Sequence, residues 1–454
     1  MTTFADLGLP REIVSTLSKE GITQPFPIQE AAIPDALAGR DVLGRGPTGS
    51  GKTFTFGLPM LARLAGSPSK PGSPRGLVLA PTRELAAQIR ERLDDPAGAL
   101  GLRVLDVVGG VNINHHIRAL ASPVDLLVAT PGRAEDLINQ KKLSFNAVEI
   151  TALDEADQMA DMGFLPQVRK LLDRTPKDGQ RLLFSATLDG DVQKLIDRYM
   201  HDPVTHSTAP VEAAVDTMEH YRLLVGGREQ RNEIAMQIAA REGKTIMFMR
   251  TKHGVDRQVK KLRRVGINAE GLHGDKSQGA RTRALDGFSG GTTPVLVATD
   301  IAARGIDVDD VSLVVHIDPP AEHKAYLHRA GRTARAGTSG TVVTLVMDEQ
   351  ENEVAQLMRK AGVDAPEVKV AAMSESLVTI TGARVADGAP LPPPGQPKQA
   401  GQAGARSGTR RGGAGRGRSG RGGSNRGSSN RSGGGRRGAS RGRRGENQRR
   451  SNGR

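Results

Sequence analysis

The stretch Gly46-Pro47-Thr48-Gly49-Ser50-Gly51-Lys52-Thr53 decides the architecture of this chain. It fits the pattern Gly-x4-Gly-Lys-Thr, in which backbone N–H groups surround phosphates and the Lys reaches the β- and γ-phosphate oxygens. The apolar pair Val42-Leu43 precedes it, and a helical stretch follows. The stretch therefore predicts a nucleoside triphosphate site in the turn between a buried strand and a helix.

A second motif, Asp154-Glu155-Ala156-Asp157, ends a short apolar strand that begins near Ile150. Carboxylates at a strand end can hold Mg²⁺ through its water shell and polarise an attacking water. The two motifs together, in this order, predict a site that binds Mg-ATP and hydrolyses it.

Length and composition narrow the class of protein further. With 454 residues the chain is long enough for two or three domains, and with no cysteine it has no disulfide framework. This usage fits a reducing, cytoplasmic setting. The first residues resemble no signal peptide, and no apolar run approaches the length of a membrane span, so we expect no membrane partner.

The net charge of +14 is concentrated at one end of the sequence. Residues 401–454 hold 16 Arg, 18 Gly and a single acid, Glu446, whereas the remainder holds 48 basic and 49 acidic residues. This segment has no large apolar side chain to bury, which predicts a disordered tail. A flexible polycation favours a polyanionic partner, most simply nucleic acid.

Short β-rich runs separated by helical stretches make up the rest of the chain. Because these runs do not alternate apolar with polar residues, they predict parallel sheets covered by helices on both faces. The rhythm breaks between His201 and Met218, which predicts two α/β domains with a hinge. We expect domains at 1–207 and 219–370, a linker at 208–218, and a linker with the disordered tail at 371–454.

Residues 1 to about 365 resemble the two-domain core of the DEAD-box ATP-dependent RNA helicases. The resemblance is carried by the two motifs above and by an adenine-reading segment, in which Phe26 replaces the family's usual Thr. That segment contains Phe4, Gly21, Pro25, Pro27, Ile28 and Gln29. The resemblance implies two RecA-like domains, ATP and Mg²⁺ as ligands, and RNA or ribonucleoprotein complexes as partners. The Gln29 amide can bond both N7 and N6 of adenine, and an aromatic ring such as Phe4 can stack on the base.

The resemblance also assigns roles around the triphosphate. Gly46 to Thr53 hold the phosphates, Thr53 ligates Mg²⁺, and Asp154 holds it through water. Glu155 deprotonates the attacking water. The arginine-finger pair is Arg332 and Arg335, and Asp307 contacts the ribose. The residues that couple the two domains are Asp157, Ser185, Thr187 and His328.

Short motifs on both domains match the family's RNA-binding loops. Exposed N–H groups at helix starts and Gly turns bind phosphates without reading sequence. The expected contacts are Pro81, Thr82, Arg83, Gly110, Thr130, Pro131, Gly132 and Arg133 in the first domain, and Arg250, Gly274, Gln278, Arg281, Thr299 and Asp300 in the second.

Two other functions stay open at this point. A DNA helicase of the same superfamily would share Lys52, Glu155 and the arginine pair, although the adenine-reading segment and the Asp154–Asp157 motif favour RNA. A passive RNA-binding or annealing protein would use the basic tail alone. The expected activity is RNA-stimulated ATP hydrolysis that separates short duplexes or remodels RNA–protein complexes, with the tail tethering RNA.

Overall fold

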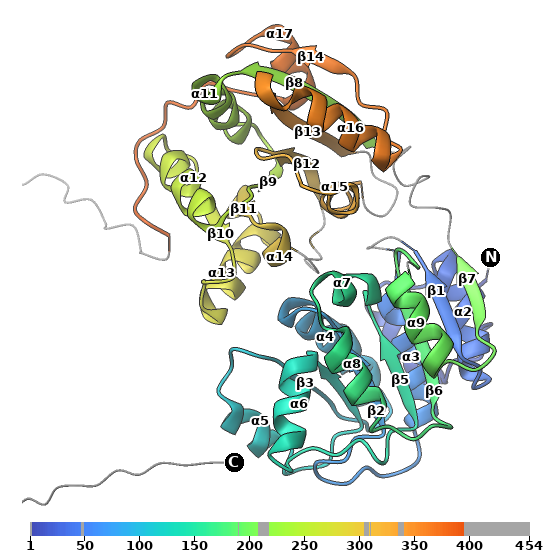
Figure 1. The fold of residues 1–454 in the computed structure, drawn as a ribbon. Helices are drawn as coiled ribbons and strands as arrows, with labels where there is room; N and C mark the ends of the chain where they lie inside the picture. The colour runs from blue at the N-terminus through green and yellow to red at the C-terminus, as the bar shows by residue number, and fades with distance from the viewer. Residues whose placement is uncertain are drawn as a thin grey trace, which may run out of the picture. The chain divides into compact units, whose positions relative to one another are not determined.

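The computed structural model describes residues 2–46, 50–188, 190–207, 218–303, 308, 310–334 and 340–394. These residues fold into two seven-stranded sheets, both wholly parallel, with helices packed around them (Figure 1). We call residues 2–207 the first half and residues 218–394 the second half. Both halves belong to one compact unit. The predicted tail at 401–454 lies outside the described residues, as does most of the expected linker.

The first half has the strand order β3-β4-β2-β5-β6-β1-β7. Its strands are β1 Val42–Arg45, β2 Gly76–Leu79, β3 Val104–Val107, β4 Leu126–Ala129, β5 Ile150–Leu153, β6 Gln180–Ser185 and β7 Val204–Ser207. Its helices are α1 Arg11–Lys19, α2 Pro27–Leu37, α3 Lys52–Leu64, α4 Arg83–Ala99, α5 Ile113–Ala119, α6 Pro131–Asn139, α7 Ala156–Asp161, α8 Leu165–Leu172 and α9 Gly190–Tyr199.

The second half repeats the pattern with the order β10-β11-β9-β12-β13-β8-β14. Its strands are β8 Met218–Gly226, β9 Lys244–Phe248, β10 Ala269–Leu272, β11 Val295–Ala298, β12 Val311–His316, β13 Gly340–Met347 and β14 Glu367–Lys369. Its helices are α11 Arg228–Ala239, α12 Lys252–Arg264, α13 Gln278–Ser289, α14 Asp300–Ala303, α15 His323–Ala330, α16 Glu351–Ala361 and α17 Glu375–Thr381, with a short 3₁₀ helix, η2, at Asp348–Gln350.

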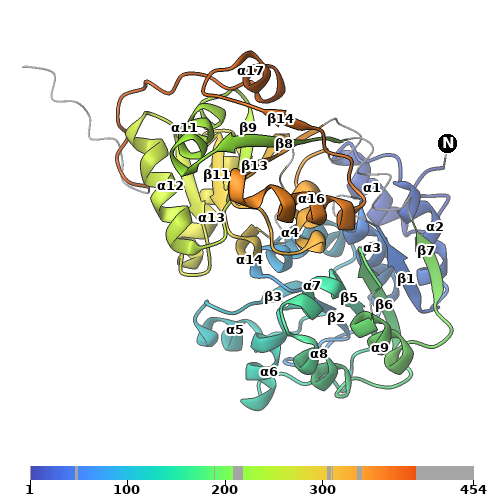
Figure 2. The same cartoon turned by 45° about the horizontal axis from the view of Figure 1, so that its top comes forward.

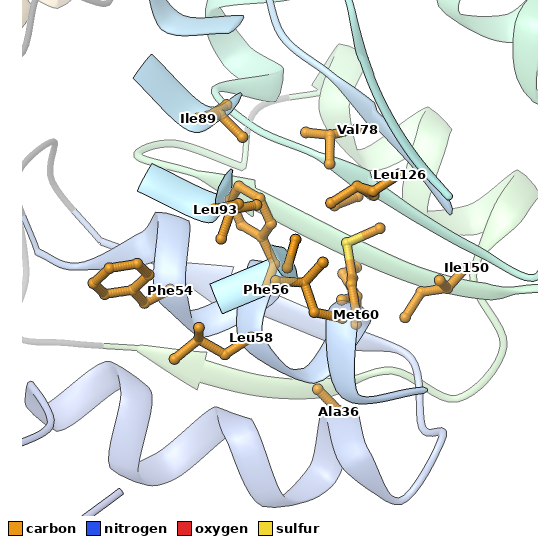
Figure 3. Packing of buried hydrophobic residues seen from close by; sticks show 14 of the residues in the cluster. Ala36, Phe54, Phe56, Leu58, Met60, Val78, Ile89, Leu93, Leu126 and Ile150 are labelled. Atoms are coloured by element: carbon orange, nitrogen blue, oxygen red, sulfur yellow. The ribbon is translucent and has the colours of Figure 1, made fainter. Parts of the chain in front are cut away.

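Successive residues of the central strands enter different cores. Val78 on β2 packs with Phe56 and Leu93 of helices α3 and α4, as Figure 3 shows, whereas its neighbours Leu77 and Leu79 belong to the cluster on the opposite face. Side chains alternate across a strand, so a strand that is apolar at every position must be covered on both faces. The parallel α/β architecture expected from the uninterrupted apolar runs is confirmed.

The packed part of the second half continues beyond Val370. Leu377 of α17 is fully buried in the same cluster as Leu223 and Val343 of the sheet. The segment after α17 then runs beside α12 in both views (Figures 1 and 2). In the described part of the chain, no helix is long and apolar enough to cross a membrane.

Candidate active site

The ammonium of Lys52 is the centre of a buried charged cluster in the first half. Helix α3 begins at Lys52, directly after Gly51, whose φ of 86° lies in the left-handed region that favours glycine. Lys52 Nζ donates to the Gly46 carbonyl oxygen at 3.0 Å and to Glu155 Oε1 at 3.1 Å. The fold thus brings the Lys of the first motif onto the second carboxylate of the other motif.

Burial and charge compete to set the protonation of this cluster. Burial disfavours the charged form and raises the pKa of Asp154. Burial is the largest single effect on Glu155 and acts against its ionised form, but Lys52, Arg332 and His328 together outweigh burial and lower the pKa of Glu155. Burial is also the largest single effect on Lys52, but the charges of Glu155, Asp154 and Asp157 together outweigh it, so the pKa of Lys52 rises. Lys52 and Glu155 therefore form an ion pair at neutral pH.

Glu155 also has an unusual backbone conformation. Its φ of 54° and ψ of 52° are left-handed, although the residue carries a large side chain. Such a conformation costs about 1–3 kcal/mol and concentrates at functional sites. Here it turns the chain directly from β5 into α7, with the Glu155 N–H donating to Asp154 Oδ1 at 3.0 Å. The strain therefore supports a catalytic position for this carboxylate.

The surrounding oxygens suit a magnesium ion. Mg²⁺ is usually held by one or two protein oxygens together with substrate phosphates and waters. Asp154 is only 2% exposed, and a cation would stabilise a carboxylate whose pKa burial raises. Thr53 follows Lys52 in the first turn of α3, and the buried Ser50 hydroxyl finds no hydrogen-bond partner in the described structure. These groups fit a nucleotide with its metal.

The adenine-reading segment differs from expectation in one residue. Gln29 Oε1 accepts the Phe26 N–H at 2.8 Å, and its Nε2 donates to the Gly51 carbonyl at 3.0 Å, which ties α2 to the start of α3. Phe4, expected to offer a ring to the base, is 2% exposed in the core of the first half. That expectation is wrong for this structure because apolar packing takes the whole ring, whereas Phe26 is 45% exposed beside Gln29.

The expected coupling residues do lie together. Asp157 Oδ2 accepts from the Thr187 N–H at 2.9 Å and from its hydroxyl at 3.1 Å. The Ser185 hydroxyl accepts the Asp157 N–H at 3.2 Å and donates to the Thr187 carbonyl at 2.6 Å. His328 of α15 brings its Nε2 to 4.0 Å from the same carboxylate oxygen. One buried Asp therefore contacts the end of β6 and a residue of the second half.

Arg332 follows α15 and is almost fully buried. Its Nε donates to the His328 carbonyl at 3.3 Å, and its charge helps to lower the pKa of Glu155 after the larger effect of Lys52. His328, Arg329 and Arg332 line one pocket. The other expected nucleotide contacts, Pro47, Thr48, Gly49, Asp307 and Arg335, lie outside the described residues.

Two arginines of the first half's expected RNA interface lie close together. Arg83 packs against Gly110, whose φ of 75° lies in the left-handed region that favours glycine. Arg133 Nη2 donates to the Val111 carbonyl at 2.8 Å. Burial and the nearby charge of Arg83 lower the pKa of Arg133. Two cations held near each other favour an anionic ligand.

The remaining first-half candidates lie at helix starts. The Thr82 hydroxyl caps α4 by accepting the Leu85 N–H at 3.2 Å. Thr130 is the N-cap of α6, and Pro131 and Gly132 follow it. Free N–H groups at a helix start suit phosphate oxygens. These positions therefore keep the geometry that the sequence predicts, and their contact with RNA stays a prediction.

In the second half, two expected RNA contacts have protein partners. Arg281 is buried, and its Nε donates to Glu84 Oε1 of the first half at 2.6 Å. Asp300 accepts from Arg329 Nη2 at 2.8 Å. Arg281 and Asp300 are thus ion-paired within the protein, and their contact with RNA stays a prediction. Arg250 and Gly274 are exposed, and Gln278 and Thr299 are partly exposed.

Comparison with known proteins agrees with this geometry. Residues 26–195 match the model described as DEAD/DEAH box helicase, and residues 230–337 match the helicase conserved C-terminal domain. The DEAD-box ATP-dependent RNA helicase CshA of Geobacillus kaustophilus is 37% identical over 379 residues, which cover 83% of this chain and 80% of that protein. The chain belongs to the DEAD-box helicase family. The resemblance read from the motifs is confirmed.

Other members of the DEAD-box family show how far the likeness extends. The chloroplastic DEAD-box ATP-dependent RNA helicase 3A of Zea mays is 41% identical over 367 residues, which cover 79% of this chain but only 49% of the maize protein. The chain thus aligns with about half the length of that relative. The structure of S. cerevisiae Dbp5 bound to RNA and ADP BeF3 covers 84% of this chain and 99% of its own, with 28% identity and a TM-score of 0.74.

For this DEAD-box chain, the sequence reasoning missed Glu84 and Arg329 as parts of the site. Glu84 was visible in the first turn of α4, but its partner Arg281 is 197 positions away, and no local pattern links the two. Arg329 also stacks over Phe248, with 5.0 Å from guanidinium to ring centroid. Its position between His328 and Arg332, in a stretch already assigned to the site, is a sequence signal that could have identified it.

Proposed function

We propose that this chain is an ATP-dependent RNA helicase, which couples ATP hydrolysis to separating short RNA duplexes or remodelling RNA–protein complexes. The observation that carries the proposal is the Lys52–Glu155 ion pair together with the Asp157 network that reaches Ser185, Thr187 and His328. The first pair can perform hydrolysis. The network gives the hydrolytic site a physical connection to the second half.

The ion pair suggests how nucleotide binding prepares the catalytic base. Glu155 is a weak base while Lys52 neutralises it. A triphosphate in the loop offers Lys52 stronger anionic partners than a single carboxylate, and loss of the Lys52 contact raises the basicity of Glu155. Glu155 can then accept the proton of the attacking water. Lys52 can thus pair either with Glu155 or with the triphosphate. The exchange of partners links nucleotide binding to activation of Glu155 as a base.

The metal site would use the residues that fit it. Thr53 would ligate Mg²⁺ directly and Asp154 through water. When bound, the ion supplies positive charge against the β- and γ-phosphate oxygens. Arg332 would stabilise the charge that develops on the γ-phosphate, and such arginines contribute about 10³–10⁵ in rate in related phosphoryl transfer. Gln29 would select adenine, since its amide still has one N–H and one lone pair to offer.

RNA would be held by its phosphates. Arg83, Arg133 and the helix starts of α4 and α6 in the first half would bind one strand together with Arg250 and Gly274 of the second half. Closure of the two halves on ATP would bend that strand until it no longer fits a duplex, and hydrolysis would release it. The Arg-rich tail at 401–454 would keep RNA near the site through its charge of +15.

The test compares polymers as activators of ATP hydrolysis by the full chain. Single-stranded RNA should stimulate the ATPase strongly, and DNA of the same sequence only weakly, because the 2′-OH is the group that marks RNA at a contact. The Lys52→Ala variant serves as a control and should hydrolyse no ATP with either polymer. Equal stimulation by DNA would instead support a DNA helicase. RNA binding without any stimulated hydrolysis would support a passive annealing protein.

A further inference from the structure

Helix α12 carries an uncompensated row of positive charge. The part of the chain outside the tail is almost neutral, yet α12 holds six Lys and Arg residues and one acid, Asp256. Asp256 is already bonded to Lys276 at 2.9 Å and faces His273 Nε2 at 3.2 Å. It therefore contributes little toward balancing the rest of the helix.

Four of the basic residues share one face. Arg257, Lys260, Lys261 and Arg264 are spaced by three, one and three positions, the spacing of one helical stripe. Arg257, Lys260 and Arg264 are exposed, Lys261 is half-buried, and none of them forms an ion pair within the described structure. Burial and the charges of Arg257 and Arg231 lower the pKa of Lys261. We call these four residues the α12 basic face.

The last described segment is fixed to the end of this helix. The Gly388 N–H donates to the Val265 carbonyl at 3.1 Å, and the Leu391 N–H donates to the Arg263 carbonyl at 2.8 Å. Arg263 Nε donates in turn to the Pro392 carbonyl at 2.6 Å. A Cβ built on Gly266 would lie 2.5 Å from Gly388 Cα, so the two backbones meet where only glycine fits. Residues 388–392 are therefore held against the carboxyl end of α12.

The α12 basic face is separate from the expected RNA loops. Helix α12 starts beside Arg250 and Thr251 at the carboxyl end of β9, and its 13 residues span about 20 Å toward the opposite edge of the sheet. Arg257 to Arg264 occupy the last two turns. The face thus begins about one turn from those loops and ends at the carboxyl end of the helix, where residues 388–392 are bound.

We propose that the α12 basic face binds the phosphate backbone of RNA outside the hydrolytic core. The partner rests on the proposed function, which supplies RNA at the neighbouring loops. Four cations without carboxylate partners suit a polyanion, and a helical stripe presents them in a row, as a strand of phosphates requires. Lys and Arg bound to phosphates read no sequence, so the face should hold any RNA strand.

The test removes charge from the face and leaves the helix intact. In the full chain, Arg257→Gln, Lys260→Gln and Arg264→Gln are combined, because Gln has a helix propensity close to that of Lys and Arg. The matched control combines Lys142→Gln, Arg174→Gln and Lys177→Gln, which remove the same charge from exposed positions of the first half. Binding of a fluorescent single-stranded RNA is measured by anisotropy at 50 and 200 mM salt.

Each lost phosphate contact should reduce the log–log salt slope by about 0.7, so three contacts reduce it by about 2. Over this fourfold change in salt, the wild type should lose about 20-fold more affinity than the α12 variant. The control should behave as the wild type does. An α12 variant with wild-type affinity and slope would overturn the proposal, as would an equal loss in the control. Failure of the proposed function would appear separately, as absent RNA stimulation of the wild-type ATPase.

Discussion

Two buried polar clusters, one in each half of the molecule, differ in whether they carry charge. In the first half, Lys52 and Glu155 are buried as ions, each charge stabilised by the other. In the second half, His220 Nδ1 bonds the hydroxyl of the fully buried Tyr326 at 2.7 Å, and no carboxylate accompanies them. Burial lowers the pKa of His220 to about 4, so this group stays neutral. The cluster around Lys52 holds buried charge, whereas the cluster around Tyr326 holds a neutral hydrogen bond.

The difference follows from what each cluster must do. Hydrolysis needs a base and a phosphate-binding cation, and both must be charged before the substrate arrives. The second cluster lies beneath α15, the helix that carries His328 and precedes Arg332. His316 packs edge-on against Tyr326 with centroids 4.9 Å apart, which adds a neutral contact between α15 and β12 beside the Arg329–Asp300 ion pair. The Lys52 cluster thus supplies reactive charge, and the Tyr326 cluster supplies neutral support to the helix that precedes Arg332.

Breaking the charged cluster should have the largest effect. Glu155→Gln removes the base but keeps its shape and an oxygen that can still accept from Lys52. We expect RNA-stimulated turnover to fall by about 10²–10⁴-fold, with ATP and RNA binding largely retained. Steady-state ATPase assays and nucleotide titrations measure the two effects separately. Turnover above about a tenth of the wild-type value would mean that another group activates the water.

Much of the fold could be predicted from the sequence because its signals are local. Uninterrupted apolar runs such as Leu126–Ala129 marked central strands, and the Gly-rich loop marked the turn into α3. The edge strand β7 was missed because its burial pattern is mixed, and its place depends on pairing with β1. The ordered segment after Val370 was missed for a similar reason: its hydrogen bonds reach Gln237, Val265 and Arg263 far back in the chain.

The site was predictable where a motif fixes its own geometry. The positions of Lys52, Glu155 and Asp157 followed from loops at strand ends. The environment of Phe4 did not, because an aromatic residue near a nucleotide loop can face either the ligand or the core, and only packing decides. The pairing of Arg281 with Glu84 depends on how two distant helices approach, whereas the assignment of Arg281 to RNA came from a short motif that matches the family's RNA-binding loops.

The stability around His220 and Tyr326 should decrease at acidic pH. The pKa of His220 is lowered from 6.5 to about 4, so protonation favours the unfolded state. The stability that comes from burying neutral His220 is fully present above pH 6.5 and is lost as pH falls toward 4. Between pH 7 and pH 5 this costs about 2 kcal/mol. Amide hydrogen exchange of β8, corrected for the intrinsic effect of pH, measures the local opening free energy in the wild type and in His220→Gln.

The comparison with the variant isolates His220 together with its effect on His316. His116 and His316 also have lowered pKa values, chiefly because they are buried, and both remain in the variant. The effect of His116 cancels, whereas the charge of His220 is itself one of the causes that lower the pKa of His316. The stability difference between the two proteins should therefore shrink by about 2 kcal/mol from pH 7 to pH 5. A difference that is independent of pH would show that His220 is not held neutral, and the contrast between the halves would fail.

The last prediction tests whether the Tyr326 hydroxyl contributes to stability because it is buried. Tyr326→Phe removes one oxygen and leaves a buried His220 nitrogen without a partner, which costs about 1–3 kcal/mol. Tyr199→Phe is the matched change in the first half, where the hydroxyl donates at 2.8 Å to Asp173, a residue with a 47% exposed side chain. Water can replace that bond, so the loss should stay within about 0.5 kcal/mol. Hydrogen exchange at β13 and at α9 measures each change locally. Equal losses would mean that the second half's cluster owes its stability to ring packing, which both variants keep, and not to its neutral hydrogen bond.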